Sequence, residues 1–202
     1  MTETELQSIK IIADPKSATT CQFMVDRPVY PDSSFYFGSK ESAEGSPLAE
    51  RLFAIAGVSA ALIAHDRVTV TKAGTDEWLP IARQVGQAIR QHIGSGQPAV
   101  SEEMRNKIPP ADEFRNRVQH VLDTRINPAV ASHGGVVGLI DVQGNTVYIQ
   151  LGGGCQGCGM ADVTLKQGIE VEIRAAVPEV GEILDTTDHA AGRNPYYTPS
   201  RK

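Results

Sequence analysis

Two cysteines, Cys155 and Cys158, are the residues whose type and spacing best suit chemistry in this chain. They lie in a glycine-rich segment that runs from Gly152 to Gly159. This spacing lets both sulfurs turn toward one point, where thiolates ligate metal or exchange disulfides. A structural zinc site or an iron–sulfur cluster usually requires four ligands, and the chain has no second pair of this kind. Either the pair does redox chemistry alone, or two copies of the protein share one metal centre.

The surroundings of the pair favour thiolates. A free cysteine has a pKa of about 8.5, and a position at a helix N-terminus lowers this pKa. Cys158 directly precedes a predicted helix, and the neighbouring glycines can point backbone N–H groups at sulfur. Three interpretations remain open: a thiol–disulfide oxidoreductase, half of a zinc site with His133 as the nearby histidine, or a [4Fe–4S] cluster held by Cys155 and Cys158 of two subunits about a two-fold axis.

The composition is that of an ordinary globular protein, with 41% hydrophobic and 21% charged residues. A formal net charge of -5 disfavours nucleic-acid binding. Three cysteines do not make a secreted disulfide framework, and no stretch approaches the roughly 20 apolar residues of a membrane span. The acidic start is not a targeting leader. We therefore expect a cytoplasmic protein.

The elements around these residues predict an α+β protein of two small domains. The first half predicts ββαββα, from strands over 20–26 and 34–38, a helix over 47–56 that Ser46 caps, a hairpin closed at His65-Asp66, and a helix from Trp78 to Gly94. The second half predicts αββαβ. Its first element is a long helix with an apolar stripe from Phe114 to Val130, which Pro128 should kink or shorten, and a hairpin and the CxxC loop follow. A helix over 162–176 comes next, because apolar residues recur every four positions from Leu165 to Val177 although 169–173 alternates like a strand, and an edge strand over 180–184 ends the unit.

These halves define the expected domains. Residues 1–94 form the first, 95–110 a polar linker rich in glycine and proline near its ends, 111–189 the second, and 190–202 a polar tail. The first half has no phosphate loop, Ser/His/Asp grouping or carboxylate pair placed for acid–base work. We therefore expect it to recognise other proteins, with a purely structural role as the alternative.

The chain also resembles a known family. The run from Leu151 to Glu170 closely resembles the Nfu family of iron–sulfur carriers, and Ile126–Val136 looks like that family's helix and double-glycine turn. The segment 187–197 is similar to the tail of its bacterial members, and residues 12–93 resemble the separate Nfu N-terminal domain. One departure is Gly159-Met160-Ala161, where many relatives have a Pro-Ser-Ser-like stretch.

The resemblance implies a carrier and not an enzyme. Such a carrier binds a [4Fe–4S] cluster through Cys155 and Cys158 of two subunits, receives it from an upstream scaffold and delivers it to apo-proteins. Neither a nucleic acid nor a membrane is expected as a partner.

Other candidate residues favour ordinary roles. Cys21 alternates with Phe23 and Val25 on an apolar face and is expected to be buried. Lys166 could offset cluster charge, but a solvated lysine is the simpler expectation. We expect His133 to be a turn residue or a donor near the cluster loop, and Trp78 to lie in the core. His65 and His92 are expected to be structural or exposed, and Tyr196-Tyr197 to anchor a client protein or to form a tail without a role.

Overall fold

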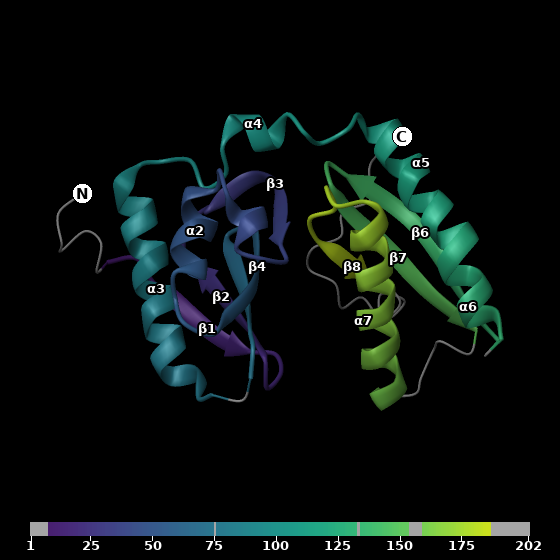
Figure 1. Cartoon of the computed structure of the whole chain (residues 1–202), viewed down its shortest axis with the longest axis horizontal. Helices are drawn as coiled ribbons and strands as arrows, with labels where there is room; N and C mark the ends of the chain where they lie inside the picture. The colour runs from purple at the N-terminus through teal and green to yellow at the C-terminus, as the bar shows by residue number, and fades with distance from the viewer. Residues whose placement is uncertain (1–7, 75, 133, 154–158, 187–202) are drawn as a thin grey trace. The chain divides into compact units, whose positions relative to one another are not determined.

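The computed structural model describes residues 8–74, 76–132, 134–153 and 159–186 (Figure 1). The chain divides into two compact units, Met1–Pro109 and Pro110–Lys202. Each combines helices with one sheet, so the predicted α+β class is confirmed.

The first unit is built on an antiparallel sheet in the order β1-β2-β5-β4-β3. In Figure 1, α2 and α3 lie side by side against this sheet. Its described elements are β1 (Ile11–Pro15), β2 (Thr20–Val25), β3 (Tyr30–Phe37), the 3-10 turn η1 (Glu41–Ala43), α2 (Pro47–Phe53), β4 (Val58–His65), β5 (Arg67–Lys72), α3 (Trp78–Ser95) and α4 (Glu102–Arg105).

The predicted order ββαββα omitted the first strand. β1 pairs antiparallel with β2, with Ile11 opposite Val25 and Pro15 opposite Cys21. It shows no alternation of buried and exposed residues, because Ile12 and Ala13 are both exposed. An edge strand that buries so little carries a weak sequence signal, and proline is tolerated there.

The predicted cap of α2 is confirmed and has a second contact. Ser46 Oγ accepts a hydrogen bond from Ala49 N at 3.2 Å and donates one to the Ala99 carbonyl oxygen at 2.6 Å. Ala99 and Val100 are 3% and 0% exposed within the first unit's core. Part of the predicted linker 95–110 is therefore a packed segment of the first unit, and it contains the short helix α4.

The second unit has a sheet in the order β6-β7-β8, antiparallel between β6 and β7 and parallel between β7 and β8. Its described elements are α5 (Ala111–Val121), the π-helical segment η2 (Leu122–Ile126), α6 (Asn127–Ala131), β6 (Gly135–Gln143), β7 (Thr146–Gly153), α7 (Gly159–Ala176) and β8 (Ile183–Asp185). The predicted order αββαβ is found, with its first helix in three parts.

Pro128 explains why that helix is divided. Proline has no backbone N–H, and its ring crowds the carbonyl group four residues earlier, here that of Thr124. The helix widens into η2, which ends at Ile126, and then resumes as α6, whose second residue is Pro128. Thr124 Oγ1 donates to the His120 carbonyl oxygen at 2.7 Å inside this bend.

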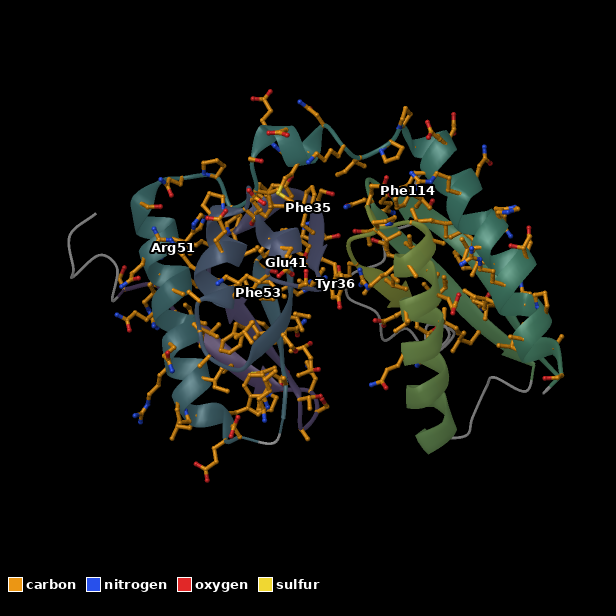
Figure 2. All side chains as sticks on the ribbon, in the orientation of Figure 1. Phe35, Tyr36, Glu41, Arg51, Phe53 and Phe114 are labelled. Atoms are coloured by element: carbon orange, nitrogen blue, oxygen red, sulfur yellow. The ribbon has the colours of Figure 1, made fainter. Side chains whose placement is uncertain are left out.

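The predicted apolar stripes form the core of this unit. All six residues of the first stripe, which begins at the Phe114 labelled in Figure 2, are at most 5% exposed: Phe114, Val118, Val121, Leu122, Ile126 and Val130. Ile169 and Ile173 of α7, and Val177 directly after its end, pack against them. The predicted helix is confirmed over 169–173, although this stretch alternates like a strand, because residues four apart lie on the same face of a helix. None of the described helices has the length and apolarity to cross a membrane.

Candidate metal centre

The CxxC segment connects β7 to α7. β7 ends at Gly153, and α7 begins at Gly159, directly after Cys158. This is the predicted order of strand, cysteine pair and helix. Cys155 and Cys158 themselves, like His133 and Tyr196-Tyr197, lie outside the described residues. The structure therefore shows the two elements that flank the segment, β7 and α7, which together form its frame.

Two glycine pairs form the strand side of this frame. In the ladder between β6 and β7, Gly135 is opposite Gly153 and Val136 is opposite Gly152. A Cβ atom at Gly153 would lie 2.2 Å from the Gly134 carbonyl oxygen, and one at Gly152 would lie 2.9 Å from Val136 Cγ1. Gly153 also has a φ of +61°, a conformation that favours glycine. The double-glycine turn after α6 thus lies in direct backbone contact with the residues that lead into the cysteines.

Asn127 attaches α6 to the outer edge of β6. Its Nδ2 donates to the Val137 carbonyl oxygen at 3.0 Å, and its Oδ1 accepts from Val137 N at 2.8 Å. Sequence reasoning did not single out this residue. The signal available was an Asn directly before Pro128, at the end of an amphipathic stripe and ten residues before the strand position that it bonds.

The end of β8 also lies beside β7. Thr186 donates to the Ile149 carbonyl oxygen from its backbone N at 2.7 Å and from Oγ1 at 3.0 Å. Lys166 of α7 forms an ion pair with Asp185, with 2.7 Å between Nζ and Oδ2. Lys166 is therefore a partly buried lysine paired with Asp185 rather than a freely solvated one.

Cys21 has the packing role that was predicted for it. It is 1% exposed among the core residues of the first unit. Burial, followed by the charge of Asp14, raises the pKa of its thiol, which disfavours the reactive thiolate.

The two histidines of the first unit differ. His65 is exposed at the β4–β5 turn with a φ of +48°. His92 on α3 is 2% exposed, and its Nδ1 has no hydrogen-bond partner. Burial, with a smaller contribution from the Arg51 charge, lowers the pKa of His92 to about 4.

Trp78 is partly buried against the core of the first unit. Its Nε1 donates to the Ala18 carbonyl oxygen at 3.1 Å, and Lys72 Nζ lies 5.3 Å from its ring centre. These contacts fix the start of α3. Over the described parts of the chain, no group of three or more His, Cys, Asp and Glu residues is arranged to hold a metal ion.

Fold and sequence together define the class. This is a two-domain α+β protein whose second domain carries a glycine-framed CxxC segment between a strand and a helix. Family comparison agrees for both parts. Residues 9–96 match the family model "Scaffold protein Nfu/NifU N terminal", and residues 118–184 match the "NifU-like domain". The chain belongs to the Nfu/NifU-like proteins.

Curated relatives carry a matching name. The chain is 50% identical over 95 residues to the "Fe/S biogenesis protein NfuA" of Stutzerimonas stutzeri, covering 45% of this chain and 49% of that protein. It is 47% identical over 104 residues to the protein of the same name from Pseudomonas syringae pv. tomato, covering 50% and 51%. The chain thus spans about half the length of these relatives.

Among solved structures, a NifU-like protein from Saccharomyces cerevisiae is similar to this chain. The TM-score is 0.44 at 18% identity, covering 50% of this chain and 91% of that one.

Proposed function

We propose that this protein is an iron–sulfur cluster carrier that binds a [4Fe–4S] cluster between two subunits and transfers it to apo-proteins. The observation that carries the proposal is the single CxxC pair, placed between β7 and α7 of a domain that matches the NifU-like family. Cys155 and Cys158 of each subunit are the proposed ligands. The relatives from Stutzerimonas stutzeri and Pseudomonas syringae are named Fe/S biogenesis proteins, and this supports the same function.

The number of thiolates suits a carrier. Two cysteines give half of the four ligands that such a cluster requires, so a two-fold contact between identical chains completes the set. A cluster shared in this way is released when the subunits separate or when the thiols of a client displace the ligands. The role needs binding and release without catalytic turnover, and we therefore propose a carrier rather than an enzyme.

The first unit is proposed to recognise proteins. Its fold brings together a sheet, two main helices and a closed core, and its one described cysteine is buried there with a raised thiol pKa. Recognition of an upstream scaffold and of apo clients in the cytoplasm is the role that remains for a separately packed domain joined to a carrier domain.

Anaerobic reconstitution of the full chain tests the proposal. Wild-type protein should take up about four irons and four sulfides per two chains, with the mass of a dimer. Cys155→Ser and Cys158→Ser should each abolish uptake, because each removes two of the four thiolates in a symmetric dimer. Cys21→Ser is the matched control and should load like the wild type.

Three results would contradict this function. One zinc per chain would indicate a zinc site, and a full cluster on a monomer would exclude sharing. Cysteine-dependent reduction of insulin would instead support a thiol–disulfide oxidoreductase.

A further inference from the structure

The backbone of β6 is held on both sides where it approaches the cysteine segment. On one side it pairs with β7, through Gly135 opposite Gly153 and Val137 opposite Leu151. On the other side Asn127 takes both the N–H and the carbonyl oxygen of Val137. We propose that Asn127 is a positioning residue for the cluster loop: by fixing β6 at Val137, it holds the Gly134–Gly135 turn against Gly152–Gly153 and so sets where the cysteine segment begins. This inference rests on the proposed function.

Strand geometry gives Asn127 this role. β6 is an edge strand, and in an antiparallel pair the N–H and carbonyl of one residue point to the same side. Since both groups of Val137 bond Asn127, they point away from β7. Asn127 therefore occupies the position that a neighbouring strand would take, and it blocks pairing with another chain at this point.

The position of β6 matters because its Gly134–Gly135 turn is packed directly against Gly152–Gly153. The Gly153 backbone lies so near the Gly134 carbonyl oxygen that no side chain fits between them. Val137 is two residues from Gly135, so a shift of β6 at Val137 is passed directly to this contact. The Asn127 bonds are part-buried, where solvent competes poorly for the backbone groups.

Only an amide matches both groups of Val137. Asparagine offers one donor and one acceptor, whereas aspartate offers acceptors alone. Asn127→Asp keeps the size of the side chain but places a carboxylate oxygen against the Val137 carbonyl oxygen. Asn127→Ala removes both bonds. If the bonding pattern matters, these two variants should behave alike, although only one of them leaves a cavity.

Asn145 provides the matched control. It lies at the β6–β7 turn, the other end of the same hairpin, is 0% exposed and donates from Nδ2 to the Glu179 carbonyl oxygen at 2.9 Å. Asn145→Ala therefore also removes a buried side-chain bond from the second unit, but far along both strands from the cysteines. Urea unfolding of all variants establishes how far each lowers the stability of the unit.

The first measurement uses the metal-free full chain. Hydrogen exchange of the amides of 135–137 and 152–153 reports on the frame without any cluster. We expect about tenfold faster exchange of these amides in Asn127→Ala and Asn127→Asp, beyond any change seen in Asn145→Ala, because losing the side-chain bonds lowers the free energy of local opening.

The second measurement uses the loaded dimer. The loss of cluster absorbance after addition of an iron chelator gives the time for which the cluster is retained. Both Asn127 variants should lose it about 10–100-fold faster than the wild type, and Asn145→Ala at nearly the wild-type rate.

Three outcomes decide the matter. Equal exchange and equal retention in the Asn127 and Asn145 variants would overturn the proposal, as would wild-type behaviour of Asn127→Asp. A wild-type chain that takes up no cluster would refute the proposed function instead, while the exchange data would still decide whether Asn127 holds the frame.

Discussion

Acidification should destabilise the first unit through His92. This side chain is 2% exposed, its Nδ1 has no partner, and its pKa is lowered to about 4 from an ordinary 6.5. The folded state therefore binds a proton less readily than the unfolded state. The stability contributed by neutral His92 is present above the unfolded pKa and is lost as the pH falls from about 6.5 toward 4.

The magnitude follows from the shift. A pKa difference of about 2.5 units corresponds to about 3 kcal/mol once the pH is low enough for His92 to be protonated in both the folded and the unfolded state. Between about pH 7 and pH 5 the expected loss is about 2 kcal/mol, because His92 stays neutral in the fold while the unfolded histidine charges. His92→Leu removes this titration and leaves an apolar side chain of similar size in the core.

Trp78 offers a direct assay. It is the sole tryptophan of the chain and belongs to the first unit, so its fluorescence reports the unfolding of that unit in urea. Unfolding free energies are compared for wild type and His92→Leu at several pH values. The difference between the two proteins should move by about 2 kcal/mol in favour of the variant on going from about pH 7 to pH 5. Parallel stability curves over this range would refute the reasoning.

Two further predictions concern packing. A fragment of residues 1–96 should be about 2–4 kcal/mol less stable to unfolding than residues 1–109, because it lacks the buried Val100 and Ala99, which bonds the α2 cap Ser46. Trp78 fluorescence measures both fragments, and equal stability would show that this segment does not contribute. Gly153→Ala should lower the stability of the second unit by at least about 2 kcal/mol, since a Cβ would lie 2.2 Å from a carbonyl oxygen at a positive φ. Gly138→Ala on the facing strand, where nothing lies within 4 Å, is the control; urea-dependent hydrogen exchange of the second unit measures both, and similar losses would contradict the account.

Strong local signals were sufficient for most elements. The Ser46-Pro47 start of α2, the hairpin at His65 and the stripe from Phe114 to Val130 are confirmed because capping, turn chemistry and helical period act within a few residues. β1 escaped detection because its pairing with β2 supplies the stability that its own sequence does not show.

At the candidate site, too, the features set by neighbouring residues were predictable. The strand β7, the glycine-rich segment with the two cysteines and the helix α7 are contiguous in the chain, so their order could be predicted from the sequence.

The amino-acid sequence by itself determined that Cys155 and Cys158 lie between a predicted strand and a predicted helix, and that the chain has no second pair of this kind. Only the tertiary structure decided that Gly134 touches Gly153, that Asn127 bonds the edge of β6 at Val137, and that Asp185 pairs with Lys166. The physical reason is distance along the chain. Each of these contacts joins residues 10 or more positions apart, and such pairs meet only after the sheet and helices have packed.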